Sequence, residues 1–187
     1  MNRKITTLFL ATFIALNGCT GTRHYLMTPA SPDTTPPPTE VAIGVGPVTL
    51  AGHLQRKNIV TRTSATRIRI AQDDYWAIPL DTHLLDLLAT NLRQRLGIDN
   101  TPNFPWPPST RVDYQITVHI TRFIHEGDYV YLDAYWRILD GPSSKVADDS
   151  ITIGESSGSN YDQIVNAMSR AVGRLADHIA DAIRVRL

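Results

Sequence analysis

The sequence predicts an α+β fold in which two long helices pack on a mostly antiparallel, twisted sheet of about five to six strands. The first observation is the alternation of apolar and polar side chains in residues 112–121, 130–138 and 145–153, which short turns separate. This period of two is typical of antiparallel strands with one buried face. The second observation is the return of apolar residues every three or four positions in residues 81–96 and 160–182, which is typical of amphipathic helices.

The N-terminus is typical of a lipoprotein signal. Arg3 and Lys4 precede an apolar run over residues 5–16, and Cys19 is the only cysteine of the chain. An apolar run of this length is too short to span a bilayer of about 30 Å, so we expect residues 1–18 to be removed. Acyl chains such as palmitate on Cys19 would anchor the protein permanently, at about 0.8 kcal/mol per buried CH₂. An ordinary signal peptide beside a stray thiol is the alternative.

The residues that follow the signal predict where the protein lies. Thr20 stands where an Asp would favour the inner membrane in enteric-type bacteria, so we expect the periplasmic face of the outer membrane. Residues 19–40 are rich in proline and predict an extended, lipid-anchored tether. His24–Leu26 is its one apolar patch, which could pack back on the domain. Residues 41–187 are then expected to form a single domain.

The composition excludes several classes of protein. The chain has 18 basic and 18 acidic residues, and loss of Arg3 and Lys4 leaves a mature chain with a slight negative charge. This balance provides no basic field for nucleic acid. With Cys19 acylated, neither a disulfide nor a thiol nucleophile is expected. The histidines lack metal-ligand spacing, and no nucleophile elbow or phosphate loop occurs, so we expect no metal, no cofactor and no enzyme activity.

Three strands are predicted before the first helix. Residues 41–48 form the first, and Pro47 places it at an edge or ends it. Residues 59–63 and 66–70 are β-branched runs that predict a hairpin. Its arginines either bind a phospholipid head group or a partner carboxylate, or belong to a solvated sheet face. They are Arg62, Arg67 and Arg69.

The first helix is expected to follow residues 73–80. Asp81 is placed to cap its first turn, and Gly97 to end it in the left-handed conformation. Asp73 and Asp74 form a carboxylate pair only in the sequence, without a partner base or metal ligand beside them. The buried face of the helix is a leucine stripe at positions 84, 85, 88, 92 and 96.

Residues 102–108 contain repeated prolines that break regular structure, and we expect this loop to stay out of the sheet. Its aromatic residues, Phe104 and Trp106, either fold back on the core or form a contact surface. A proline-stiffened aromatic loop loses little entropy when a partner binds, so both interpretations stay open.

A row of tyrosines, Tyr129, Tyr131 and Tyr135, lies on the strand face opposite Trp136. This face is either covered like the first or is an exposed amphipathic surface for another subunit.

The last helix is expected to run nearly to the C-terminus. Asn160 and Gln163 fit a capping box at its start. Gly173 lies inside the helix, where glycine costs about 1 kcal/mol against alanine. We therefore expect the helix to press closely on a strand or on the other helix at this position.

Eight short segments follow one another in a characteristic order: Tyr25-Leu26, Ile43 to Val48, Ile59 to Arg62, Trp76 to Leu80, Asn91-Leu92, Pro105-Trp106, Asp113-Tyr114 and Ala134 to Trp136. Together they resemble the PqiC/YmbA-type lipoproteins, the auxiliary lipoprotein component of ABC-type transport systems. The resemblance covers essentially the whole mature chain. The chain departs from the usual pattern at residues 52–58 and at Ile78.

The resemblance implies a non-enzymatic subunit of an MCE-type, paraquat-inducible lipid transport system that supports membrane integrity. Such a lipoprotein sits on the outer membrane and meets an MCE-domain tunnel protein, which crosses the periplasm from an inner-membrane permease-like component. A homo-oligomer is also implied. The candidate partner-binding residues are Phe104, Trp106, Arg62, Tyr129 and Tyr131. The alternatives are a lipoprotein that assembles or pilots another envelope machine, and a periplasmic hydrolase with a site built from distant residues.

Overall fold

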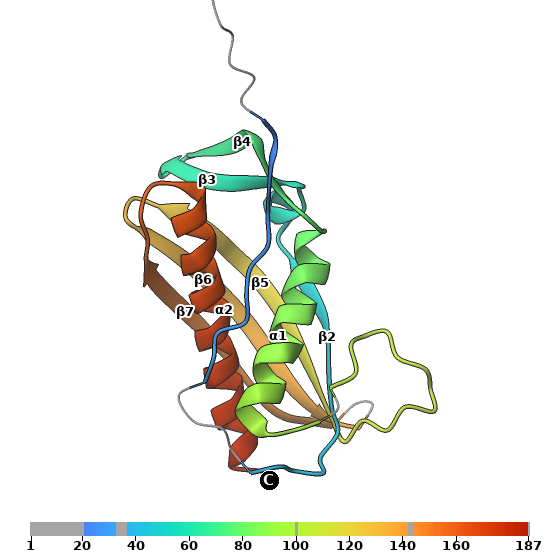
Figure 1. The fold of residues 1–187 in the computed structure, drawn as a ribbon. Helices are drawn as coiled ribbons and strands as arrows, with labels where there is room; N and C mark the ends of the chain where they lie inside the picture. The colour runs from blue at the N-terminus through green and yellow to red at the C-terminus, as the bar shows by residue number, and fades with distance from the viewer. Residues whose placement is uncertain (1–20, 33–36, 100, 142–143, 187) are drawn as a thin grey trace, which may run out of the picture.

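Two helices cover one face of a seven-stranded sheet (Figure 1). The computed structural model describes residues 21–32, 37–99, 101–141 and 144–186. In chain order the elements are β1 (Arg23–Tyr25), β2 (Ile43–Leu50), the 3₁₀ turn η1 (Gly52–Leu54), β3 (Asn58–Ser64), β4 (Arg67–Trp76), α1 (Leu80–Leu96), β5 (Tyr114–Glu126), β6 (Tyr129–Asp140), β7 (Ser144–Ser156) and α2 (Tyr161–Arg184).

The sheet is mixed, with the order β1-β4-β3-β5-β6-β7 and with β2 paired to β5. The hairpins β3–β4, β5–β6 and β6–β7 are antiparallel, as the alternation predicted. The pairs β1–β4, β2–β5 and β3–β5 are parallel. The predicted sheet of five to six mostly antiparallel strands is corrected accordingly. Parallel pairs join strands that are distant in the chain, so no local turn signals them.

The long strand β5 pairs with two strands, β2 and β3, along the same edge. Residues 43–50 of β2 pair with residues 114–120 of β5, and Thr61 and Arg62 of β3 pair with residues 125–126. Strand β4 also extends through Asp73–Trp76, which were expected to lead into the helix. The hairpin of β3 and β4 thereby forms one end of the molecule.

Helix α1 begins one residue before the predicted cap. Pro79 is its N-cap, and Asp81 lies within the first turn, where its Oδ1 accepts a hydrogen bond from the Thr82 amide at 2.8 Å. The capping role predicted for Asp81 is therefore wrong, although a carboxylate in the first turn still favours the helix dipole. The predicted end is confirmed, because Gly97 takes φ 63° and closes the helix onto the Arg93 carbonyl.

Helix α2 begins where the sequence predicted. The Asn160 side chain accepts a hydrogen bond from the Gln163 amide at 2.9 Å. The close approach predicted at Gly173 also exists, but its main partner differs. A Cβ added to Gly173 would lie 2.6 Å from the Cβ of Ala30, which the sequence assigned to the tether.

Residues 23–30, called the N-terminal strap below, lie against the folded domain. Strand β1 pairs with β4, and the side chains of Tyr25 and Met27 are buried. The Ala30 amide donates to Asn91 Oδ1 at 3.1 Å, and Arg95 Nη1 donates to the Ala30 carbonyl at 3.0 Å. The prediction of a tether over residues 19–40 is therefore corrected for this segment, which belongs to the fold.

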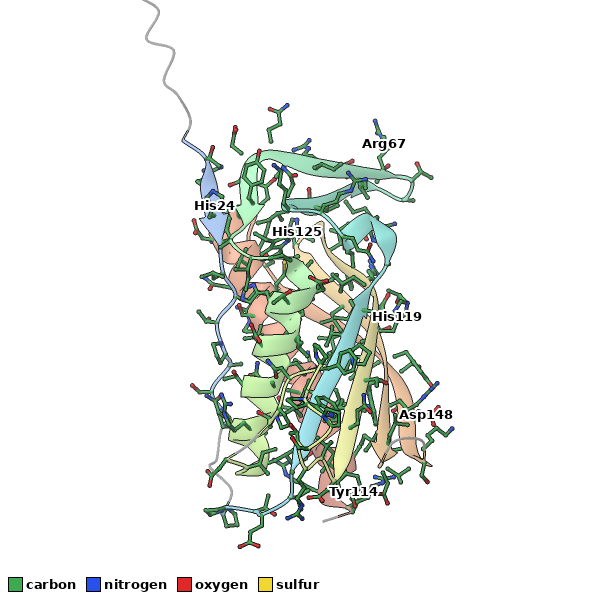
Figure 2. All side chains as sticks on the ribbon, turned by 90° about the vertical axis from the view of Figure 1, so that its right-hand side faces the viewer. His24, Arg67, Tyr114, His119, His125 and Asp148 are labelled. Carbon is green, nitrogen blue, oxygen red and sulfur yellow. The ribbon has the colours of Figure 1, made fainter. Side chains whose placement is uncertain are left out.

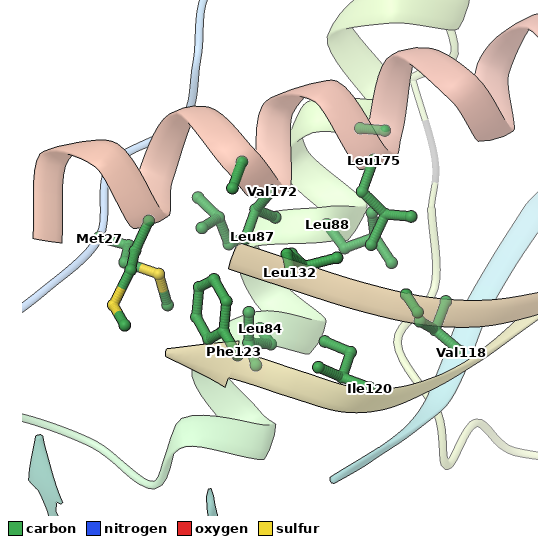
Figure 3. Packing of buried hydrophobic residues seen from close by; sticks show 14 of the residues in the cluster. Met27, Leu84, Leu87, Leu88, Val118, Ile120, Phe123, Leu132, Val172 and Leu175 are labelled. Carbon is green, nitrogen blue, oxygen red and sulfur yellow. The ribbon is translucent and has the colours of Figure 1, made fainter. Parts of the chain in front are cut away.

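One continuous core fills the space between sheet and helices. Figure 3 shows Phe123 and Leu132 of the sheet facing leucines of α1, with Met27 of the strap closing one side. The predicted leucine stripe is buried at positions 84, 88, 92 and 96, while Leu85 is partly buried. Apolar packing thus connects the strap, the helices and the sheet in one core.

Candidate functional site

The five predicted partner-binding residues fall into two groups at opposite ends of the molecule. Phe104 and Trp106 lie on the loop that precedes β5. Arg62, Tyr129 and Tyr131 lie where β5 turns into β6 and beside the β3–β4 hairpin. Figure 2 shows the two ends, with Arg67 near one and Tyr114 near the other.

The loop of residues 102–108 rests on the free edge of β2. The Val45 amide donates to the Pro102 carbonyl at 2.9 Å, and the Phe104 amide donates to the Val45 carbonyl at 2.8 Å. Val45 and Asn103 thus form a parallel bridge, and the expectation that this loop stays out of the sheet is wrong. Since β5 occupies only one edge of β2, the other edge was open to cover.

The two aromatic rings of this loop behave differently. Trp106 folds back over Gly44, where an added Cβ would lie 2.7 Å from Cη2 of the ring. Phe104 meets Trp106 edge-on, with centroids 5.6 Å apart, and stays 43% exposed. Both interpretations of the loop are therefore half right: one ring anchors the loop and the other faces solvent.

The second group gathers around Arg122, which the sequence analysis did not single out. Arg122 Nη2 donates to Glu126 Oε2 at 2.7 Å, and its guanidinium lies 4.1 Å from the centroid of the Tyr131 ring. Arg62 Nε lies 3.5 Å from Glu126 Oε2, and the ring of Tyr129 lies 6.0 Å from that of Tyr131. We call these five residues the arginine–tyrosine cluster.

Strand register explains how the arginine–tyrosine cluster forms. Glu126 pairs with Tyr129, and Arg62 pairs with Glu126 from the other side, so their side chains share one face. A register shift after Ile120 turns Arg122 onto the same face. The one available sequence signal was the break in alternation at this point.

The tyrosine row lies on the sheet face that is turned away from both helices. Figure 2 shows His119 and Asp148 on this side, with the helices on the other. Tyr129 is 47% exposed, and the Tyr135 hydroxyl donates to Asp148 Oδ2 at 2.7 Å. Among the described elements no helix covers this face, so it is exposed, and its contact with another subunit stays a prediction.

A polar contact also closes the end from which the strap begins. Asp74 is buried and accepts two hydrogen bonds from Arg23, at 2.7 and 3.0 Å, and one from the Tyr25 hydroxyl at 2.9 Å. Burial, followed by the bond to Asp74, raises the pKa of Tyr25 to about 12. Asp74 thus joins strap and hairpin and forms no pair with Asp73.

The remaining chemistry of the described residues is sparse. A groove of about 460 Å³ lies between η1 and the start of α1, with Trp76 and Ile78 on its walls and Arg56 and Lys57 among its lining residues. Within the described ranges, no three His, Asp, Glu or Cys side chains gather closely enough to hold a metal ion.

Comparison with known proteins decides the family. The model of the family described as "ABC-type transport auxiliary lipoprotein component" matches residues 25–180. This chain belongs to that family. The match confirms the predicted resemblance, and it begins at Tyr25 in the strap. The family is one of transport auxiliary lipoproteins and not a known enzyme family, which indicates a membrane-anchored component of the cell envelope.

Two solved structures share the fold of this auxiliary lipoprotein. One is an uncharacterized protein, with a TM-score of 0.72 and 20% identity, over 87% of this chain and 99% of that one. The other is protein XCC0632 from Xanthomonas campestris, with a TM-score of 0.71 and 16% identity, over 85% and 93%. None of the curated proteins matches the chain.

The lipidation site and the helices bear on how the protein relates to a membrane. Cys19, the predicted lipidation site, lies outside the described residues. Neither helix of the described chain combines the length and the hydropathy that a membrane span requires.

Proposed function

We propose that this auxiliary lipoprotein is the outer-membrane subunit of an MCE-type intermembrane lipid transport complex. In this role, residues 1–18 are removed and acylated Cys19 holds the protein on the periplasmic face. The loop of residues 102–108 then docks the MCE-domain tunnel protein that extends from an inner-membrane permease-like component. The protein performs no reaction; it positions the tunnel end and supports membrane integrity.

The observation that carries this proposal is the state of Phe104. Its backbone is fixed to β2 and its ring is braced by Trp106, yet 43% of the residue is exposed. A large aromatic side chain that is already ordered loses little entropy on binding, which is what a docking anchor requires.

The position of the loop supports the same role. Strand β1 pairs with β4 just before α1 begins, and the loop follows just after α1 ends. Helix α1 has 17 residues, which at 1.5 Å per residue separates its two ends by about 25 Å. A protein anchored through the strap would therefore present Phe104 away from the bilayer, where a tunnel crossing the periplasm would arrive.

Co-purification from detergent-solubilised envelopes tests the docking. We expect wild-type protein to recover an MCE-domain protein, and Phe104→Ala to reduce the recovery roughly 30-fold, as loss of an interface hot spot of about 2 kcal/mol does. Tyr129→Ala is the matched control, because it removes an equally exposed ring from the other end of the molecule. If Tyr129→Ala alone abolishes recovery, docking occurs through the sheet face instead.

Two further outcomes separate the alternatives. If wild-type protein recovers an unrelated envelope machine and no MCE-domain protein, the role of assembly or pilot factor replaces the proposal. The mass of the purified particle in detergent tests the homo-oligomer implied by the family resemblance.

The anchor has its own test. Mass spectrometry of the mature N-terminal peptide should find Cys19 acylated as the first residue, and fractionation should find the protein with outer membranes. A Cys19→Ser variant should lose both properties. An intact N-terminus with an unmodified thiol would refute the lipoprotein assignment at this residue.

A further inference from the structure

The end of the molecule nearest the lipid anchor carries exposed aliphatic side chains next to arginines. On β4, Ile68 and Ile70 are 42% and 40% exposed, and they alternate with Arg67 and Arg69, which are also exposed. Because side chains alternate along a strand, the hairpin presents isoleucines on one side and arginines on the other. Both sides of its outer part therefore face solvent in the isolated protein.

The surrounding surface has the same character. Leu26, directly after β1, is 55% exposed, and Ile78 follows β4 on the way into α1. The Ala77 amide donates to the Tyr25 carbonyl at 3.0 Å, so the segments that carry Leu26 and Ile78 lie side by side. Exposed aliphatic side chains that gather at one end of a domain indicate a contact with an apolar phase or a partner.

Two arginines of β4, Arg67 and Arg69, are not neutralised within the described fold. The ion pairs among the described residues engage Arg23 and Arg62 at this end, and leave Arg67 and Arg69 without a carboxylate within 4.0 Å. Among the described residues, the Arg67 guanidinium donates one hydrogen bond, to the Ser64 hydroxyl at 3.5 Å. Unpaired arginines close to a membrane attract anionic head groups, by about 1 kcal/mol per residue.

Covalent geometry brings this end close to the bilayer. Cys19 and Arg23 are four positions apart, a reach of at most about 14 Å even when fully extended. Arg23 is fixed opposite Asp74 of β4, and Ile70 is likewise four positions from Asp74 along that strand. An acyl chain on Cys19 therefore holds the hairpin within one strand length of the head groups.

We propose that the β3–β4 hairpin is a second membrane contact, whose arginines bind anionic phospholipid head groups while Ile68 and Ile70 enter the interface. The occupant of this surface is the bilayer around the anchor. This combination of shallow apolar side chains and adjacent cations is the one that interfacial protein segments use. The inference rests on the acylation of Cys19 in the proposed function, and it adds that the anchored domain has a fixed orientation.

Depth-dependent quenching tests the contact in the full-length acylated protein. With Cys19 modified, an introduced cysteine is the only free thiol, so Ile68→Cys can carry an environment-sensitive fluorophore. In phosphatidylcholine vesicles containing phosphatidylglycerol, we expect spin-labelled lipids with a shallow nitroxide to quench this label. The same label at Ser109→Cys, on the opposite end, should remain unquenched.

The cations have a separate readout. The double variant Arg67→Gln, Arg69→Gln should lower quenching at position 68 in anionic vesicles to the level seen with phosphatidylcholine alone. Arg186→Gln, an exposed arginine near the C-terminus, is the matched control and should leave quenching unchanged. Equal quenching in both lipid mixtures, with no effect of the double variant, would overturn the head-group contact.

The outcomes distinguish this inference from the function on which it rests. If the protein fails to float with vesicles, the anchor is absent and the proposed function fails. If it floats and the label at position 68 is unquenched, the anchor holds and the hairpin contact is wrong. If the label is shielded equally in detergent and the particle contains several copies, a second copy covers the hairpin, which also contradicts the proposal.

Discussion

The N-terminal strap and the loop of residues 102–108 both contain proline and little regular structure, yet the fold holds them differently. The strap is bound along its length, through the β1–β4 pairing, Asn91, Arg95 and the Ser169 hydroxyl, which accepts from the Thr28 amide at 3.2 Å. The loop is bound at its base by one bridge and by a ring laid on a glycine. The segment next to the anchor is thus immobilised throughout, whereas the segment proposed for docking keeps a free ring.

The largest loss of stability is expected when the buried polar partner of the strap, Asn91, is removed. Asn91 is fully buried, accepts from the Ala30 amide and from Arg95 Nη1, and donates to the Leu87 carbonyl. Asn91→Leu would leave the Ala30 amide without its acceptor and would remove one acceptor of Arg95 Nη1, which keeps the Ala30 carbonyl, and we expect it to lower the free energy of unfolding by about 3 kcal/mol. Urea denaturation measures the loss. Gln94→Leu, at an exposed site of the same helix, is the control and should change stability little.

A side chain added at Gly44, beneath the Trp106 ring, should destabilise the loop of residues 102–108. An alanine Cβ at position 44 would lie 2.7 Å from the Trp106 ring, so Gly44→Ala should cost about 2 kcal/mol. In a Trp106→Ala background the ring is gone and only the tight contact with Val112 Cγ1 at 3.0 Å remains, so the same substitution should cost clearly less. Gly154→Ala is the matched strand control, since its Cβ would meet Tyr131 at 3.6 Å, an ordinary contact. An equal cost with and without the Trp106 ring would contradict this account of the loop.

A smaller effect is expected at the first residues of the strap. Tyr25→Phe removes one of the three hydrogen bonds to Asp74 and should cost about 1 kcal/mol at neutral pH. Because the folded state raises the pKa of Tyr25 from 10.0 to about 12, stability should be complete below pH 10 and fall as the pH rises from there towards 12. Tyr25→Phe should flatten this alkaline slope in pH-dependent denaturation. An unchanged slope would place the titration elsewhere.

The smallest expected effect is a loss of stability at acidic pH through His83, which contacts the strap. His83 is buried, and its Nε2 donates to the Met27 carbonyl at 3.2 Å. Burial lowers the pKa of His83 below 6.5, and burial also lowers that of His125. The unfolded chain therefore binds more protons, and the free energy of unfolding should decrease as the pH falls below 6.5. His83→Gln should remove part of this slope, while His24→Gln, at an exposed position of the strap, should not.

Short stretches of sequence were sufficient to predict the structure where consecutive elements of the chain pair with each other. The hairpins of β5, β6 and β7 follow from alternation and short turns, and Gly97 and Asn160 mark helix termini through their own backbone and side-chain chemistry. Asp81 misled because an acidic residue suits both a cap and a first turn. A shift of one or two residues in the start of the helix decides whether Asp81 is the cap or part of the first turn.

Contacts between residues far apart in the sequence could not be predicted in this way. The strap was taken for a tether because Pro29 and its neighbours suggest extended chain, and nothing in the sequence announces that Asn91 and Arg95 will bind Ala30. The fate of Trp106 depends on Gly44, which lies about sixty residues earlier. In the same way, Arg122 belongs to the candidate site only through a register shift, which the sequence marks by nothing more than a break in the alternation.

The parallel pairing of β1 with β4 has a mechanical consequence. A pull transmitted from an acyl anchor on Cys19 would act along β1, across the evenly spaced, slanted hydrogen bonds that join it to β4. Bonds loaded in this direction resist together in shear and do not open one after another. The Arg23–Asp74 pair and the Tyr25 hydroxyl lie at the same point and share that force. Tension between a bilayer and a docked complex would therefore reach the core of the domain before it could peel the first strand away.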